Sequence, residues 1–183
     1  MSLPILTGNL VNLRQYVRSD AERLQMLADD RRVSKWLPMM PYPYKMKDAR
    51  EWINLTRRMI RQGTEVPFAI ELAGEKLLAG GIGLRTINRA DRNAEVGMWI
   101  ARRYWRQGLG CEAMTLLLKY AFGRMRLRRV YAVVHELNAG SVGLLEKSGF
   151  TREGTWRKAS KVSGRYCDVH AYGILIEEFR GRK

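Results

Sequence analysis

Stretches of apolar residues with strand-like spacing recur along the whole chain. Asn9–Arg14 alternates polar and apolar residues, as a strand with one buried face does, whereas Val130–Val134 is apolar throughout, which is typical of a strand covered on both faces. The predicted strands are Asn9–Arg14, Val66–Leu72, Lys76–Arg85, Glu95–Ile100, Val130–Val134, Phe150–Arg157 and Arg165–Ile176. No internal repeat, low-complexity tract or linker interrupts them, so the sequence predicts one mixed α/β domain over residues 1–183.

Helical spacing of apolar residues appears between these strands. In Lys47–Gln62 the apolar positions recur every three to four residues, and Gly63 follows as a stop signal. Ser19 and Glu22 predict a capping box for a helix over about Asp20–Asp29. The other predicted segments are the loops Pro38–Tyr44, Thr86–Asn93 and Lys158–Gly164, a helix after Gly110 that the basic segment Arg124–Arg129 ends, and a helix from Asn138 to Gly149.

A glycine-containing turn leads from the strand Glu95–Ile100 into a helix. Its sequence, from Tyr104 to Ala113, places Gly108 and Gly110 in a G-x-G spacing at the point where the helical pattern begins. Backbone N–H groups in such a turn converge on a phosphate, and the positive end of the helix dipole adds to the attraction. Because neither glycine has a Cβ, we expect the backbone to approach the ligand closely. The turn by itself indicates a general anion site.

The charge of the chain is strongly positive. Lys and Arg together number 33 and Asp and Glu 18, which gives a net charge of +15 at pH 7. Such a surface attracts anionic ligands and binds RNA without sequence preference, although a plain solvated basic surface is an equally open interpretation. No block of Lys and Arg is interleaved with aromatic residues, as in a strand that recognises RNA. The charge alone therefore assigns no function.

Other compositional features narrow the class of protein. No apolar run approaches the roughly 20 residues of a membrane span, and no basic-then-apolar signal opens the chain, so we expect a cytoplasmic protein without membrane association. Cys111 and Cys167 have no disulfide-framework spacing, which suits a reducing compartment. His135 and His170 are isolated and lack metal-ligand spacing, so we interpret both as structural and expect no metal.

Six blocks of the sequence, in this order, resemble the GCN5-related N-acetyltransferases. The blocks are Asn9–Arg14, Glu95–Ile100, Tyr104–Ala113, Asn138–Ser141, Glu146–Phe150 and Asp168–Tyr172. They are most similar to the branch that contains the ribosomal-protein alanine acetyltransferases, and the match covers essentially the whole chain. The resemblance implies the α/β (α+β) fold of that superfamily, in which helices flank a mixed, mostly antiparallel central sheet of about seven strands.

The resemblance also implies that acetyl-CoA is the co-substrate. Its pyrophosphate would bind the amides of the glycine turn, and the strand edge Met98–Ile100 would pair with the pantetheine amides and polarise the thioester carbonyl. Arginines near the turn add charge for the CoA phosphates or are plain surface charge. The residues expected to bind acetyl-CoA are Met98, Trp99, Ile100, Arg103, Arg106, Gln107, Gly108, Leu109, Gly110, Cys111, Asn138 and Ser141.

Two positions depart from the family pattern. Trp105 stands where the pattern has Gln or Arg, three residues before the first glycine, so pyrophosphate binding is expected to rest on amides. Leu145 stands where many relatives carry a Tyr that acts as acid for the leaving thiolate; Ser141 is the nearest candidate for that role, or else satisfies local backbone. Only a neutral amine attacks a thioester, so a base is needed. Glu95 is the first candidate, and an exposed strand-end carboxylate is the alternative.

Other side chains have two interpretations. Cys111 lies at a helix N-terminus, where a thiolate is favoured, so a covalent acetyl-cysteine step is an alternative to the direct transfer that the resemblance implies. Tyr166, Asp168, His170 and Tyr172 alternate along one strand and share a face. That face lines the acceptor site in one interpretation and belongs to the core or the sheet surface in the other.

The leading hypothesis is an acetyl-CoA-dependent N-acetyltransferase that acts on a primary amine. The resemblance favours a protein N-terminal α-amine of the ribosomal type, and a basic enzyme of this kind could associate weakly with ribosomal RNA. The alternatives are an acetyltransferase for a small amine (amino acid, polyamine or antibiotic) and a non-catalytic module that binds acyl-CoA or RNA. The basic surface is a poor match for a free polyamine. Both a monomer and a homodimer remain open.

Overall fold

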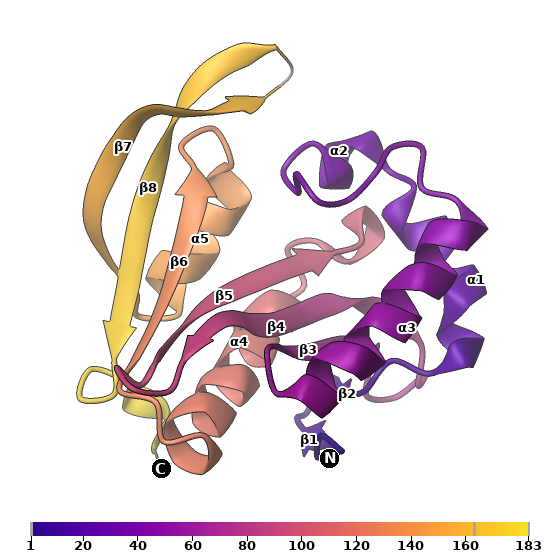
Figure 1. Ribbon diagram of the computed structural model, residues 1–183, viewed down its shortest axis with the longest axis horizontal. Helices are drawn as coiled ribbons and strands as arrows, with labels where there is room; N and C mark the ends of the chain where they lie inside the picture. Colours follow the sequence, from indigo (N-terminus) through magenta and orange to yellow (C-terminus); the bar gives the residue numbers. More distant parts are fainter. Residues whose placement is uncertain (1, 163, 183) are drawn as a thin grey trace.

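The protein is built on one eight-stranded sheet, which the computed structural model describes together with its helices over residues 2–162 and 164–182 (Figure 1). The strands are β1 (Leu6–Thr7), β2 (Val11–Arg14), β3 (Val66–Leu72), β4 (Leu78–Asn88), β5 (Asn93–Ile100), β6 (Arg129–His135), β7 (Thr151–Val162) and β8 (Arg165–Leu175). Their order across the sheet is β1-β2-β3-β4-β5-β6-β8-β7. Neighbours are antiparallel except β5 and β6, which are parallel, so the sheet is mixed and mostly antiparallel as predicted.

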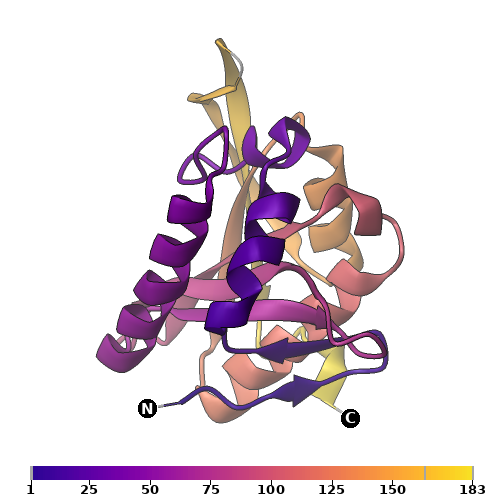
Figure 2. The ribbon, with the colours of Figure 1, turned by 90° about the vertical axis from the view of Figure 1, so that its right-hand side faces the viewer.

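Helices cover both faces of this sheet (Figure 2). The α-helices are α1 (Ala21–Ala28), α2 (Arg31–Ser34), α3 (Met46–Gln62), α4 (Leu109–Lys119) and α5 (Ala139–Lys147). Short 3₁₀ helices are η1 (Arg18–Asp20), η2 (Arg102–Tyr104) and η4 (Arg180–Arg182), and η3 (Tyr120–Arg124) is a π-helix. Helices α1 and α3 lie on one face, and α4 and α5 on the other. Among the described helices, none has the length and apolar character that a membrane span requires.

Two hydrophobic cores follow from this arrangement. The larger lies between the sheet and the α4–α5 layer and includes the fully buried Phe68, Leu117 and Tyr172. The smaller lies between the sheet and the α1–α3 layer and includes Leu24 and Ile53. Burial of each such side chain contributes about 1.5–3 kcal/mol, so the apolar stripes of the helices fix their positions on the sheet.

The sheet opens in the middle. Strands β5 and β6 pair only from Asn93 to Glu95 and from Arg129 to Tyr131, and beyond these residues they diverge (Figure 1). Each strand stays paired on its outer side, β5 with β4 and β6 with β8. The inner edges of both strands therefore carry backbone groups that no neighbouring strand of the sheet satisfies.

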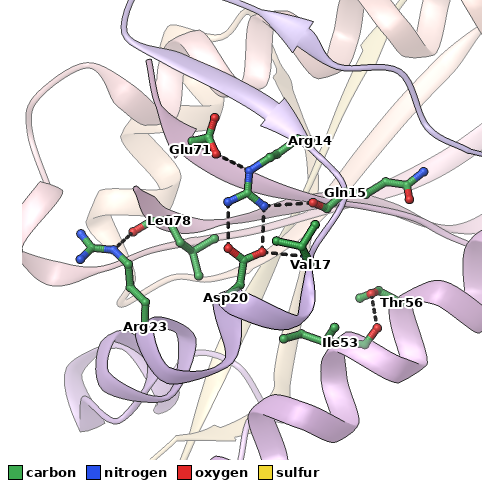
Figure 3. A network of polar contacts seen from close by, with 9 residues as sticks. All are labelled: Arg14, Gln15, Val17, Asp20, Arg23, Ile53, Thr56, Glu71 and Leu78. Atoms are coloured by element: carbon green, nitrogen blue, oxygen red, sulfur yellow. Dashed lines mark hydrogen bonds and ion pairs between the residues drawn. The ribbon is translucent and has the colours of Figure 1, made fainter. Parts of the chain in front are cut away.

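An ion-pair network joins the first strands to the first helices (Figure 3). Arg14 donates to both oxygens of Asp20, at 2.8 Å each, and its Nε donates to Glu71 on β3. The same Asp20 carboxylate accepts the N–H of Val17 at 2.8 Å. These hydrogen bonds raise the pKa of Arg14, Asp20 contributing most, and the three charged side chains are 16%, 7% and 13% exposed. The network thus fixes the start of the α1 region to the sheet.

Helix starts and strand ends differ in places from the predictions. The capping box at Ser19 and Glu22 is wrong, because Asp20 caps the preceding turn through Val17 instead. The sheet has eight strands and not about seven, because Leu6–Thr7 pairs with β2 although it is too short to show a pattern. The helix after Gly110 ends in the π-helical turn η3 before it reaches most of Arg124–Arg129.

Two predicted loops are largely strand. Strand β4 continues to Asn88 and β5 starts at Asn93, so the predicted loop Thr86–Asn93 shrinks to a tight turn. Strand β7 continues through most of Lys158–Gly164, as far as Val162. Both segments are polar because they are exposed on a long ladder, so composition alone indicated a loop.

The buried network yields a prediction for stability. We expect Asp20→Asn to lower the free energy of unfolding by about 3 kcal/mol, because it leaves the Arg14 guanidinium partly buried with a single carboxylate partner. Lys47→Gln is the matched control, since Lys47 and Glu51 form an exposed pair at 3.7 Å; we expect a change within about 0.5 kcal/mol. Urea unfolding followed by circular dichroism measures both, and equal small effects would contradict the assignment.

Candidate functional site

The turn before α4 has a backbone that presents donors. Gly108 has φ of 81° and Arg106 has φ of 61°, both in the left-handed region that glycine adopts most easily. Among residues 2–162 and 164–182, the amides of 106–110 donate no hydrogen bond to any protein acceptor. Helix α4 starts at Leu109, so its dipole adds positive potential at the same place. The turn therefore offers a set of free N–H groups suited to a phosphate, as the sequence predicted for this segment.

Side chains brace the turn and do not reach into it. The Trp105 indole N–H donates to the carbonyl of Ile100 at 2.7 Å, and the Gln107 amide donates to the carbonyl of Arg103 at 2.9 Å. Leu109 is buried in the larger core, so only its backbone is available to a ligand. The substitution of Trp105 for the family's polar residue thus ties the turn to the end of β5.

Cys111 is not part of the free amide set. Its N–H donates to the carbonyl of Gly108 at 3.1 Å, as the N–H of Glu112 does at 3.2 Å. The expected contact of the Cys111 amide with the pyrophosphate stays a prediction, and its N–H already has an acceptor within the turn. The Glu112 side chain has another role, since its carboxylate accepts the N–H groups of Asn9, Leu10 and Val11 at 2.7–2.9 Å. It fixes the first turn of α4 to the turn that precedes β2.

The backbone groups of Met98, Trp99 and Ile100 do not all point to the same edge of β5. Successive residues of a strand direct their N–H and C=O groups to opposite edges. Ala101 N–H donates to Ala79 on the β4 side, so the groups of Trp99 also face β4, whereas those of Met98 and Ile100 face the open edge. The carbonyl of Ile100 accepts from Trp105, which leaves the Met98 groups and the Ile100 N–H free for a ligand.

Trp99 is therefore not placed at the open edge by either its backbone or its side chain. Its indole packs against the smaller core, on the α1–α3 side of the sheet. The absence of a Cβ at Gly81 makes room for it, because such an atom would lie 2.8 Å from Trp99 Nε1. The indole of Trp99 thus supports β5 from the α1–α3 side, and its contact with acetyl-CoA stays a prediction.

Three elements meet at Gly110. A Cβ at this position would lie 3.2 Å from Ile100, 3.3 Å from Leu144 on α5 and 3.5 Å from Met98. Gly110 thus lets α4 approach β5 and α5 closely, which differs from the predicted approach of a ligand to its missing Cβ. The contact brings the start of α4, the open edge of β5 and the first turns of α5 to one place.

The start of α5 has the predicted cap. Asn138 Oδ1 accepts the N–H of Ser141 at 3.3 Å, which confirms Asn138 as the N-cap and leaves its amide N–H₂ group available. Ser141 is half-buried, and its hydroxyl forms no hydrogen bond within the described part of the chain. Leu145, at the position of the family's Tyr, is buried in the larger core. Ser141 is thus a polar side chain of this first turn with an unused hydroxyl.

Glu95 lies where β5 and β6 begin to part. It pairs with Tyr131 on β6 in the parallel register and with Arg85 on β4, whose guanidinium donates to Glu95 Oε1 at 2.6 Å. Its side chain is only 12% exposed, so it is not the freely exposed carboxylate of the alternative interpretation. The ion pair occupies Oε1, and Oε2 has no hydrogen-bond partner among the described residues.

A second carboxylate, that of Glu65, lies near the Arg85–Glu95 ion pair. Glu65 precedes β3 and lies beside Arg85, and burial raises its pKa, with Glu95 acting in the same direction and Arg85 opposing it. No local sequence pattern marks Glu65, because its position depends on the register of three strands. Three charged side chains, those of Glu65, Arg85 and Glu95, therefore lie side by side near the point where β5 and β6 part.

Three of the four alternating residues of β8, Asp168, His170 and Tyr172, contact other parts of the sheet or α5. Tyr172 is buried and its hydroxyl donates to Glu146 on α5 at 2.9 Å; burial raises its pKa. Asp168 accepts the N–H of Lys158 at 2.8 Å, and His170 Nδ1 lies 3.1 Å from the Thr155 hydroxyl. These contacts favour the interpretation as core and sheet surface over the acceptor site.

His135 occupies the end of the open strand β6. Its ring lies 5.9 Å from that of Trp36, which follows α2, and its Nδ1 lies 3.4 Å from the Cys167 sulfur. Burial lowers the pKa of His135, which favours the neutral ring. Among the described residues, no group of three or more His, Cys, Asp and Glu side chains is arranged to hold a metal ion.

Comparisons with known proteins agree with this geometry. Residues 11–151 match the family described as an acetyltransferase (GNAT) domain. The chain is 30% identical over 176 residues to YdaF of Bacillus subtilis (strain 168), provisionally named a ribosomal N-acetyltransferase, covering 94% of this chain and 95% of that protein. It is 30% identical over 173 residues to the spermidine N(1)-acetyltransferase of Vibrio cholerae, covering 94% and 96%.

A solved structure shows the same overall fold. RimJ of Mycobacterium smegmatis, in complex with CoA-disulfide, superimposes with a TM-score of 0.85 at 26% identity, over 96% of this chain and 86% of that one. The family match covers residues 11–151, which is most of the chain. The chain therefore belongs to the GNAT acetyltransferase family, and its activity is acetyl-CoA-dependent N-acetylation.

Proposed function

We propose that the acceptor of this acetyltransferase is the N-terminal α-amine of a peptide or protein. The observation that carries the proposal is the charge beside the open end of β6. Arg31 lies 5.7 Å from the ring centre of Tyr42, and Lys35 lies 4.5 Å from that of Trp36, which in turn contacts His135. The aromatic rings there are thus already covered by cations of the chain itself.

This electrostatic setting favours an amine that loses its proton easily. An α-amino group has an ordinary pKa of about 7.7–8.0, whereas an alkylammonium such as that of Lys has about 10.4. Neighbouring positive charges favour the neutral form further, and only the neutral form attacks a thioester. A polyamine would bring several charges that Arg31 and Lys35 repel, so a peptide N-terminus suits the site better.

The residues proposed to hold the donor are those with unused polar groups. The amides of 106–110 receive the pyrophosphate, with Arg103 and Arg106, both exposed, adding charge. The Met98 groups, the Ile100 N–H and the Asn138 side-chain amide bind the pantetheine arm. Acetyl-CoA supplies a thioester carbonyl as electrophile.

The proton steps are proposed to use two side chains. Glu95, through the carboxylate oxygen that Arg85 leaves free, accepts the proton of the amine directly or through water. A backbone N–H of the open β5 edge polarises the carbonyl. The Ser141 hydroxyl donates a hydrogen bond to the departing sulfur, since it has no other partner in the described residues. Direct transfer needs no step at Cys111.

A polyamine acceptor is the second candidate. The spermidine acetyltransferase of Vibrio cholerae is as similar in sequence as the ribosomal-type relative, so similarity does not separate the two. A third possibility, a non-catalytic acyl-CoA-binding module, would bind the donor and acetylate none of these amines. The charge beside β6 is what favours the peptide.

A panel of acceptors tests the choice. We expect peptides with a free N-terminal Ala or Ser to be acetylated with kcat/KM at least about tenfold above that for spermidine, a difference of about 1.4 kcal/mol in transition-state binding. Release of the CoA thiol measures the rate, and the same peptides with a blocked N-terminus and one internal Lys are the control. A preference for spermidine, or no reaction with any amine, would overturn the proposal.

The glycine turn yields a test of donor binding. Gly108→Val places a β-branched residue at φ of 81°, which costs about 1–2 kcal/mol, so we expect roughly tenfold weaker binding of acetyl-CoA. Gly108→Asn is the matched control, because Asn tolerates this backbone conformation, and we expect its affinity to stay near that of the wild type. Isothermal titration calorimetry measures both. Equal affinities for the two variants would remove the turn from the site.

The pH dependence of kcat distinguishes the proposed roles of Glu95 and Ser141. We expect Glu95→Gln to remove the acid limb of the kcat profile, whereas Ser141→Ala lowers kcat by about tenfold at all pH values and leaves acetyl-CoA affinity unchanged. Glu65→Gln is the comparison, since Glu65 lies near the same ion pair but farther from the open edge. Loss of the acid limb in Glu65→Gln, with an intact limb in Glu95→Gln, would assign the base to Glu65.

A further inference from the structure

A basic groove runs along the outer side of α3. It has a volume of about 720 Å³ and shares no residue with the proposed acetyl-CoA site. Its lining residues are Gln15, Glu51, Asn54, Arg57, Arg58, Ile60 and Arg61. A second hollow of about 460 Å³ continues from it at Asn54 and includes Arg18 and Arg50. Positive side chains therefore follow α3 over most of its length.

The arginines of this groove are not neutralised by the protein. Within the described part of the chain, Arg57, Arg58 and Arg61 take part in no ion pair. The one carboxylate of the lining, Glu51, lies 3.7 Å from Lys47. The groove therefore keeps a net positive charge that an external anion can satisfy.

Gln15 adds an unused donor to the groove. Its side chain extends away from the Arg14–Asp20 pair (Figure 3), and its Nε2 is buried without a hydrogen-bond partner among the described residues. A buried polar group left unpaired is unfavourable, and because Gln15 lines the groove, a turn of its side-chain amide toward a ligand acceptor would remove that cost. The polar groups of the groove are thus mostly donors, which suits phosphate oxygens.

We propose that this groove, defined by Gln15, Asn54, Arg57, Arg58 and Arg61, binds the phosphate backbone of RNA. The positive side chains from Arg50 to Arg61 span about 16 Å at the rise of an α-helix, which exceeds one phosphate and fits a run of neighbouring phosphates. The lining holds no aromatic side chain on which a base could stack, so binding has little sequence preference.

An anionic membrane is a weaker fit to the same surface. Helices that bind membranes present a broad apolar face next to their basic residues. The apolar side chain of the larger groove, Ile60, is 6% exposed and belongs to the packed side of α3. RNA binding would place the enzyme near nascent or assembling ribonucleoprotein, and it does not depend on the identity of the acceptor amine.

Salt-dependent binding tests the proposal. We expect a fluorescent oligouridine of about 15 nucleotides to bind the wild type, with affinity falling steeply between about 50 and 200 mM KCl. Together, Arg57→Gln, Arg58→Gln and Arg61→Gln are expected to weaken binding at least tenfold and to reduce the slope of log K against log salt by about 2, near 0.7 for each phosphate contact. Fluorescence anisotropy measures both quantities.

The control removes three charges elsewhere. Arg124, Arg126 and Arg157 are exposed and form no ion pair in the described residues, so their replacement by Gln is expected to change the slope little. An equal loss of RNA affinity in the two triple variants would indicate diffuse electrostatic attraction and would overturn the proposal that the groove is the binding site. Binding to phosphatidylserine vesicles without binding to RNA would overturn the RNA assignment. We expect both triple variants to bind acetyl-CoA as the wild type does. The RNA result is then independent of whether the proposed acceptor amine is correct.

Gln15 provides a second, independent variant. Gln15→Met removes the unpaired donor at similar volume, so we expect a higher Tm and a several-fold weaker affinity for the oligouridine. A lower Tm, or an unchanged RNA affinity, would show that the Gln15 amide is not a donor to the ligand.

Discussion

The parting of β5 from β6 is the constraint on which the rest of the structure depends. The strands pair over Asn93–Glu95 and Arg129–Tyr131, and beyond these residues they diverge, with the larger core on one face of the sheet and the smaller core on the other. A strand edge in this position needs partners for its backbone groups. Water can supply them, but so can the amides of an extended ligand, and the first turn of α4 lies next to the same edge at Gly110. Strand geometry and helix dipole thus act on one ligand.

Charge is distributed according to function along this framework. Near the point where β5 and β6 part, Arg85 neutralises Glu95 in part, while burial raises the pKa of Glu65. Beside the open end of β6, Arg31 and Lys35 lie over the rings of Tyr42 and Trp36. Carboxylates that are fully engaged, such as Asp20 and Glu112, serve the fold, since each fixes an element to the sheet through several hydrogen bonds.

Local patterns predicted most of the fold. The apolar stripe of Lys47–Gln62, the Asn138 cap and the glycine turn could be read from the sequence because each depends on neighbouring residues. What could not be read depends on residues far apart in the chain. Asp20 pairs with Arg14, which also contacts Glu71 on β3, and the direction of Trp99 follows only from the register of β5 with β4. Glu65 joins the site through three strands, so no local pattern marks it.

Hydrogen exchange of backbone amides tests the central claim most directly, because the account rests on amides that are free until the donor binds. With acetyl-CoA added to the protein, mass spectrometry is predicted to show strong protection of the segments 96–100 and 106–110, and little change along α3 or the β7–β8 hairpin. Protection confined to other segments, with exchange in 96–100 and 106–110 unchanged at saturating acetyl-CoA, would contradict the placement of the donor between the open strands.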